Sequence, residues 1–63
     1  MKNSRYSVGD RLVVTHTYHG FGKMEKVTVV DPEKKKINNE YCILVRKAGG
    51  IERFIPTKYV AWE

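Results

Sequence analysis

Residues 40–47 read Glu-Tyr-Cys-Ile-Leu-Val-Arg-Lys, and this stretch decides the fold. Its centre, Tyr41 to Val45, is apolar at every position, whereas a strand with one face in water alternates apolar and polar residues. No part of the chain shows the periodicity of an amphipathic helix. We therefore predict that this segment is a central strand covered on each side, as in a strongly curled sheet.

The sequence after this strand alternates turn residues with short apolar runs. Gly49-Gly50 is typical of a hairpin turn and leads into a predicted strand, Ile51 to Ile55. Pro56 lacks the amide hydrogen that a strand ladder needs, so it should end this strand. Residues 56–59 then resemble a single helical turn, and Val60 to Trp62 can form a last short strand.

The sequence before residue 40 predicts two further strands. The first is Arg11 to His16, followed by a tight glycine-containing loop at residues 18–22. The second is Lys23 to Val30, which we expect to end at Asp31-Pro32. The polar residues 32–39 should form the tip of the hairpin that returns as the central strand.

Five short strands and one helical turn indicate an all-β domain, and their spacing is that of a small five-stranded SH3-like barrel. The chain has 63 residues, enough for one domain. We expect a flexible N-terminal segment at residues 1–7 and a single domain at residues 8–63. Within the second strand, Val27 and Val29 should face the core, which would leave Val30 directed at solvent.

Composition argues against catalysis. Cys42 is the single cysteine, so no intramolecular disulfide can form, and its apolar neighbours suggest a buried thiol and not a nucleophile. His16 and His19 are too few to close a zinc site with it. We expect no enzyme activity, no cofactor and no metal. The longest apolar runs are too short to span a membrane, and we expect a cytoplasmic protein.

Charge and aromatic residues suggest a macromolecular partner. The net charge of +5 favours an acidic partner such as nucleic acid, although the single basic run, residues 34–36, is equally typical of a solvated loop. The chain has seven aromatic residues, many for so small a core, so some should be exposed. Such rings can stack on nucleobases or anchor a protein interface, but Tyr41, Tyr59 and Trp62 could also simply fill the barrel.

Five short motifs together resemble one known domain. They are Val8-Gly9-Asp10-x-Leu12-Val13-Val14, His19-Gly20-x-Gly22, Glu40-Tyr41-x-Ile43-Leu44, Gly49-Gly50 and Phe54-Ile55-Pro56. Their order resembles the RNA-polymerase-interacting domain of the CarD family and of transcription-repair coupling factor. The resemblance implies a Tudor-like barrel that docks on the β subunit of bacterial RNA polymerase, largely through an edge strand. Loops on both sides of the second strand are about two residues longer than the family pattern, and loops tolerate such insertions.

The resemblance also implies a contact surface. It assigns partner binding to Thr28, Val29, Val30, Arg53 and Phe54. Val30 should lie against the polymerase β subunit, with an ionic contact from Arg53 and an apolar contact from Phe54. The helical DNA-binding domain of CarD proteins and the motor of coupling factor are not in these 63 residues, so the chain is an excised domain or a stand-alone one. We expect a monomer, and two alternatives remain: a nucleic-acid-binding barrel, or a phage-type inhibitor of another host enzyme.

Overall fold

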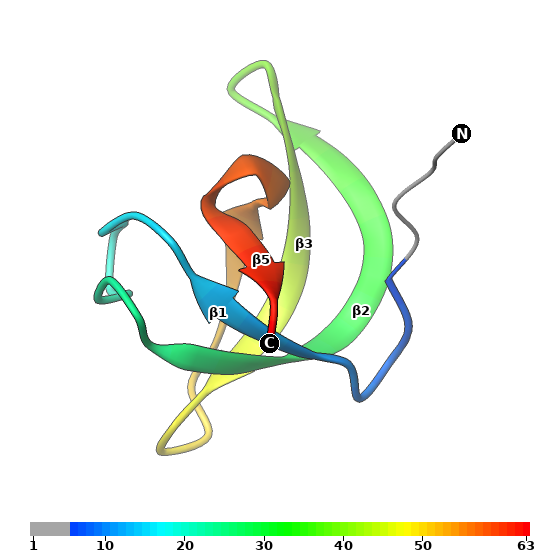
Figure 1. Cartoon of the computed structure of the whole chain (residues 1–63). Coiled ribbons are helices and arrows are strands. Elements are labelled where there is room, and N and C mark those ends of the chain that lie inside the picture. The colour runs from blue at the N-terminus through cyan, green and yellow to red at the C-terminus, as the bar shows by residue number, and fades with distance from the viewer. Residues whose placement is uncertain (1–5) are drawn as a thin grey trace.

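A computed structural model describes residues 6–63 (Figure 1). It contains five strands and one short 3-10 helix. Their bounds are Arg11–Val14 (β1), Lys26–Ile37 (β2), Glu40–Lys47 (β3), Glu52–Pro56 (β4), Thr57–Tyr59 (η1) and Val60–Trp62 (β5). The all-β class, the helical turn and the last short strand are as the sequence predicts.

The five strands form one antiparallel sheet in the order β4-β3-β2-β1-β5. The sheet curls strongly, and β2 bends through much of the curve in Figure 1. It does not close, because β4 and β5 form its two edges and η1 is the connection between them. The structure therefore shows an open, curled five-stranded sheet and does not show the closed SH3-like barrel expected from the strand spacing.

The core fills the inside of this curve. Its side chains come from all five strands and from the loop after β1: Leu12, Val14, Phe21, Val27, Val29, Ile43, Val45, Ile55 and Val60. Burying side chains of this size is the main favourable term in folding, and it explains why the apolar positions alternate along β1 and β2. The inward direction of Val27 and Val29 is confirmed, since each is at most 2% exposed.

The central strand of the sequence prediction, β3, lies between β2 and β4. Ile43 and Val45 face the core, and on the opposite face Cys42 is buried while Leu44 is half-buried. Side chains of the neighbouring strand cover part of this opposite face, because Leu44 pairs with Phe54 of β4 and the two side chains lie next to each other. Apolar residues on both faces of this strand thus correspond to partial burial of the second face.

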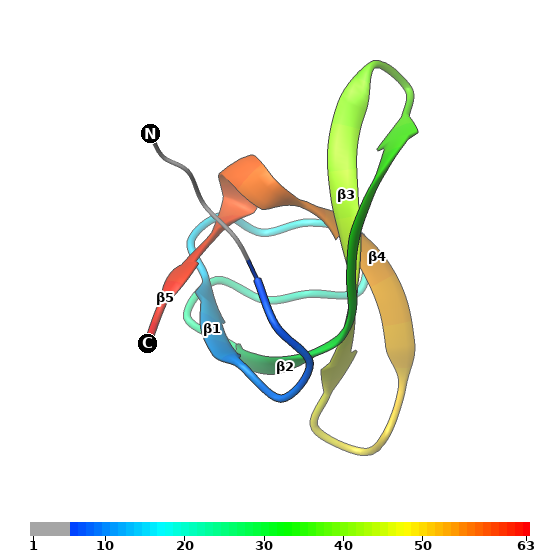
Figure 2. The same ribbon diagram turned by 90° about the vertical axis from the view of Figure 1, so that its right-hand side faces the viewer.

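The predicted end of the second strand at Asp31-Pro32 is wrong. The strand β2 continues to Ile37, and the hairpin turn to β3 consists of Asn38 and Asn39 alone, both with positive φ (Figure 2). Pro32 is tolerated because it falls in an irregular stretch, where the pairing with β3 shifts between Asp31 and Lys35 and no ladder amide is required. Asparagine adopts the left-handed conformation of a two-residue turn more readily than most residues.

Four other boundaries differ slightly from the prediction. Two of them are those of β4, which spans Glu52–Pro56 and so begins one residue later than predicted and includes Pro56. The strand β1 ends at Val14, and β2 begins at Lys26, because residues between them form turns closed by backbone hydrogen bonds. Met24 adopts a positive φ there, and its amide donates to the carbonyl of Val14 at 2.7 Å. Within residues 6–63 no helix is long and apolar enough to cross a membrane.

Candidate functional site

The structure places three of the predicted contact residues, Thr28, Val29 and Val30, at the middle of β2. Val29 is a core residue, 1% exposed, so its side chain has no surface to offer a partner. Thr28 and Val30 are half-buried. Val30 is the extra residue of a β-bulge, because Val29 pairs with Val45 and the next pair joins Asp31 to Leu44.

The other two predicted residues, Arg53 and Phe54, lie on opposite faces of β4. Arg53 pairs with the core residue Val45 and its side chain reaches the loop at Gly20, where an added Cβ would lie 3.6 Å from the arginine Cδ. Phe54 pairs with Leu44 on the outer face, where Lys35 Nζ lies 5.6 Å from the ring centroid. The five residues therefore do not form one continuous surface.

The two halves of β2 differ in their backbone pairing. Up to Val29 the strand is covered on both sides: β3 pairs with one edge, and on the other the Val29 amide donates to Asp10 while Gly9 donates to the Val29 carbonyl. From Val30 to Ile37, β3 is the single strand that pairs with β2 among residues 6–63. Among the described residues, the second half of β2 thus presents a free edge. We call this segment, residues 30–37, the β2 edge.

The direction of the backbone groups along the β2 edge follows from the hairpin turn. In a two-residue hairpin the residues that flank the turn, here Ile37 and Glu40, exchange hydrogen bonds, and antiparallel pairs then alternate. The next pair, Lys36 and Tyr41, is therefore a pair without mutual hydrogen bonds. The amide and carbonyl of Lys36 therefore point away from β3, and no other strand within residues 6–63 pairs with them.

Each of the three consecutive lysines on this segment lies near an aromatic ring. The distances from Nζ to ring centroid are 5.9 Å for Lys34 and Tyr6, 5.6 Å for Lys35 and Phe54, and 6.0 Å for Lys36 and Tyr41. Alternation along a strand explains why Lys35 lies on one face and its two neighbours on the other. Exposed contacts of this kind contribute only about 0.5–1 kcal/mol each, so a ligand can displace them.

A series of side chains runs along the core side of the sheet, beyond the core itself. Trp62 stacks on Tyr6 with centroids 4.9 Å apart, Lys34 lies over Tyr6, and Lys36 lies over Tyr41. Tyr6 packs against the core, Tyr41 shares a face with Ile43 and Val45, and Trp62 pairs with Leu12. We call Trp62, Tyr6, Lys34, Lys36 and Tyr41 the aromatic-lysine row. Tyr41 and Trp62 are 56% and 54% exposed.

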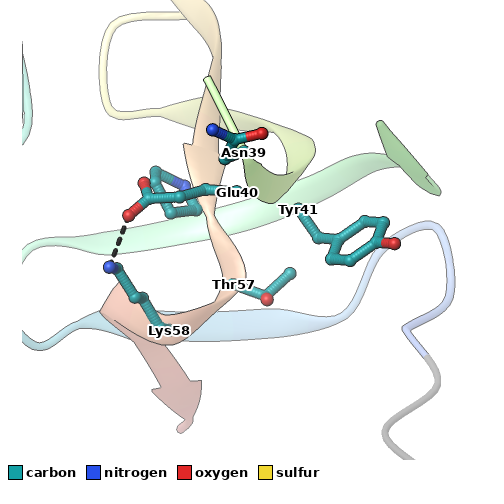
Figure 3. Close-up of a pocket in the computed structure, with 6 residues that line it drawn as sticks. Asn39, Glu40, Tyr41, Thr57 and Lys58 are labelled. Atoms are coloured by element: carbon teal, nitrogen blue, oxygen red, sulfur yellow. Dashed lines mark ion pairs between the residues drawn. The ribbon is translucent and has the colours of Figure 1, made fainter. Parts of the chain in front are cut away.

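A shallow pocket of about 330 Å³ lies at one end of this row (Figure 3). Its lining residues are Asn39, Glu40, Tyr41, Pro56, Thr57 and Lys58. Lys58 forms an ion pair with Glu40, and this hydrogen bond and charge raise the pKa of Lys58. In Figure 3 the Tyr41 ring points away from this ion pair, so one face of the ring is not used by it.

The cysteine and the two histidines, the candidates for metal binding or nucleophilic chemistry, are not part of the aromatic-lysine row as defined above. No group of three or more histidine, cysteine, aspartate or glutamate side chains within residues 6–63 could hold a metal ion. Cys42 is buried, and burial, then the charge of Glu40, raises the pKa of its thiol, so both effects disfavour the reactive thiolate. His16 and His19 pack with tyrosines, His16 against Tyr59 and His19 against Tyr18.

The aromatic-lysine row was not predicted from the sequence. Its signal is the excess of aromatic residues together with the lysine run, but the sequence pattern predicts that this run is a hairpin tip, where lysines are simply solvated. Continuation of β2 through Pro32 is what places Lys34 and Lys36 on a strand face. The flexible segment expected at residues 1–7 lies largely outside the described residues, but Tyr6 packs against the core and Ser7 donates a hydrogen bond to Asp10.

Comparisons of the chain with models of known protein families, with curated protein sequences and with solved structures give no match.

Proposed function

We propose that this chain is a non-catalytic binding module that adds its β2 edge to a strand of a protein partner. The observation that carries the proposal is the free edge of residues 30–37, which begins at the bulge of Val30. A free edge supplies main-chain donors and acceptors, and strand addition uses them for affinity while nearby side chains give specificity.

The partner that we would test first is the β subunit of bacterial RNA polymerase. Support for this choice is the resemblance of the motifs to the polymerase-interacting domain of the CarD family, in which docking is largely through an edge strand. The open curled sheet with η1 before its last strand agrees with a Tudor-like barrel, and we propose this finer fold on the same grounds. Val30 lies at the start of the free edge, which keeps it in the proposed contact.

Charge suggests the kind of strand that would bind. Lys34, Lys35 and Lys36 have no carboxylate within 4.0 Å among residues 6–63. With Asp31 and Glu33 at its start, the β2 edge carries a net charge of +1, and its positive charge is concentrated in the half that ends at the hairpin. Lysines and Pro32 on an edge also hinder pairing between copies of the same chain. An edge that repels its own copy but accepts an acidic strand is suited to a heterologous partner.

Replacing Lys36 by proline tests the proposal directly. Lys36→Pro removes the outward amide of the β2 edge and leaves the bonds between β2 and β3 in place. Lys36→Ala is its matched control, since it removes the same charge and keeps the amide. We expect the wild type and Lys36→Ala to retain the isolated polymerase β subunit in a pull-down and Lys36→Pro to lose it.

A second variant tests the contact at the bulge. Val30→Arg places a charged side chain at the start of the edge, and it should abolish retention of β while circular dichroism still shows the folded sheet. Retention of β by Lys36→Pro and Val30→Arg at wild-type levels would contradict strand addition at this edge. Absence of binding by the wild type would contradict the choice of partner.

A further inference from the structure

We propose that the aromatic-lysine row binds single-stranded nucleic acid, with its rings stacking on bases and its lysines contacting phosphates. The proposal does not rest on the polymerase proposal, because it uses side chains on the core side of the sheet, whereas strand addition uses the backbone of the β2 edge. The row joins three separate parts of the chain: the residue before the first turn, the β2–β3 hairpin and the edge strand β5.

The rings of the row are placed for stacking. Tyr41 and Trp62 each expose more than half of their surface, although large aromatic side chains in a small domain are normally used to fill the core. Trp62 is held by its stacking contact with Tyr6, and Tyr6 is anchored by packing against the core. Rings held in this way lose little conformational freedom when a base stacks on them.

The charges of the row favour phosphate. Lys34 and Lys36 form no ion pair with the described residues, whereas the carboxylates nearest in sequence to the rings are already occupied: Glu40 pairs with Lys58, and Glu63 pairs with Lys26 at 3.2 Å. The ammonium groups lie about 6 Å from the ring centroids in exposed positions. They can therefore turn to phosphates when bases take their place over the rings.

Stacking on the row requires unpaired bases. In a duplex the base faces are covered by their neighbours, so flat protein rings cannot reach them, whereas single strands offer every base for stacking. The pocket beside Tyr41 adds room for a base or sugar next to the ring, lined by the polar side chains of Asn39 and Thr57. Alternation of rings and cations is the arrangement that single-strand binders use along a positively charged groove.

Trp62 provides the readout, because it is the one tryptophan of the chain. Titration of the full chain with oligo(dT) and oligo(U) of about ten nucleotides, within the usual range of site sizes, should quench its fluorescence. A duplex of the same length should compete weakly. Both single-stranded probes test the same chemistry, and their ratio shows whether the sugar contributes.

Two double variants distinguish binding at the aromatic-lysine row from the general attraction of a basic protein for nucleic acid. The double variant Lys34→Ala/Lys36→Ala should bind about tenfold more weakly at low salt. The slope of log binding constant against log salt concentration should also be shallower by about 1.4, because each of the two lost phosphate contacts accounts for about 0.7. The control Arg11→Ala/Lys23→Ala loses the same charge from exposed sites outside the row and should change affinity less than about twofold.

Ring variants test stacking itself. Tyr41→Phe should bind as the wild type does, because the ring is kept, whereas Tyr41→Ala should lose about tenfold in affinity. Circular dichroism of each variant shows whether it is folded, and exposure of the Tyr41 ring makes both substitutions compatible with the fold.

Four results would overturn the proposal: no quenching by either oligonucleotide, equal losses in the two double variants, equal binding of duplex, or equal quenching by an acidic peptide such as oligoglutamate. The last result would make the row a protein contact. Lys36→Pro and Lys36→Ala both remove the lysine side chain, so they should weaken nucleic acid binding to the same extent. Only Lys36→Pro should abolish binding of the polymerase β subunit. Comparing the two variants in both assays therefore distinguishes a failure of the nucleic acid proposal from a failure of the strand-addition proposal.

Discussion

The amide of Val29 donates a hydrogen bond to the carbonyl of Asp10 at 2.9 Å. Together with the bond from the Gly9 amide to the Val29 carbonyl, it extends the pairing of β1 with β2 by two residues. The pairing between these two segments ends at Val29. The bulge at Val30 follows immediately, and the strand bends away from β1. This relationship divides β2 into a half that is interior to the sheet and a half whose edge is free in the part of the chain that the structure describes.

Core packing predicts a graded loss of stability. Ile43 is fully buried in the core and Ile51 is 48% exposed in the turn before β4. Ile43→Val should lower the free energy of unfolding by about 1 kcal/mol, since it removes one buried methylene. Ile51→Val removes the same group from a wet site and should change it by less than about 0.5 kcal/mol. Urea denaturation of both variants measures the difference, and equal effects would show that the core is placed wrongly.

The hairpin turn predicts a stabilising substitution. Asn39 has a φ of 66°, a conformation that glycine adopts without steric cost. Asn-Gly is the preferred pair for this turn type, so Asn39→Gly should raise the free energy of unfolding by about 0.5 kcal/mol. Asn39→Ala should lower it by about 1 kcal/mol, because alanine keeps the disfavoured Cβ but lacks the local hydrogen bonds by which asparagine tolerates this conformation. Thermal melts that rank the variants otherwise would contradict the two-residue turn.

Tyr6 predicts a loss of stability at alkaline pH. Burial raises the pKa of its phenol above the ordinary value of 10.0, since the charged form is disfavoured in the packed site. A group whose pKa is higher in the folded state contributes stability below its unfolded pKa and loses it as pH rises through the folded pKa. Wild type should therefore lose stability above pH 10 relative to Tyr6→Phe, which cannot ionise. Urea midpoints at pH 8 and pH 11 measure this, and a pH-independent difference would show that Tyr6 is exposed.

Most of the fold can be predicted from the sequence, and residues 40–47 illustrate why. A run of apolar, β-branched and aromatic residues between turn signals has few alternatives to a buried strand, and the glycine pair at residues 49–50 fixes where it turns back. The largest error is in the second strand, whose predicted end at Asp31-Pro32 comes too early because a local rule meets a tertiary exception. Pro32 ends an isolated strand, but here the bulge absorbs its missing amide.

The candidate surfaces were less predictable than the strands. Whether Val30 is at an edge depends on where β1 stops pairing with β2, a long-range property that no local pattern encodes. The proximity of Tyr6 and Trp62 likewise arises because the two ends of the described chain meet on one side of the curled sheet. Closure of the barrel, which the strand spacing suggested, depends on whether β4 and β5 pair, and they do not.

Cys42 predicts a thiol that reacts only when the sheet opens. It is 2% exposed, its pKa is raised by burial and then by the charge of Glu40, and its Sγ lies 3.7 Å from the Glu40 carbonyl. Reaction with a thiol reagent at pH 8 should be slow in the native state and fast in urea, since only the exposed thiolate attacks.

Two variants separate opening of the sheet from electrostatics as the control on this reaction. Ile43→Val, which weakens the core beside Cys42, should speed the reaction about fivefold, in proportion to the larger open fraction for a loss of about 1 kcal/mol. Glu40→Gln removes the nearby charge without exposing the sulfur, and it should speed the reaction far less, because burial is the main reason the thiol stays protonated. A larger acceleration by Glu40→Gln than by Ile43→Val would mean that Cys42 is accessible in the folded sheet, and that charge, not packing, protects it.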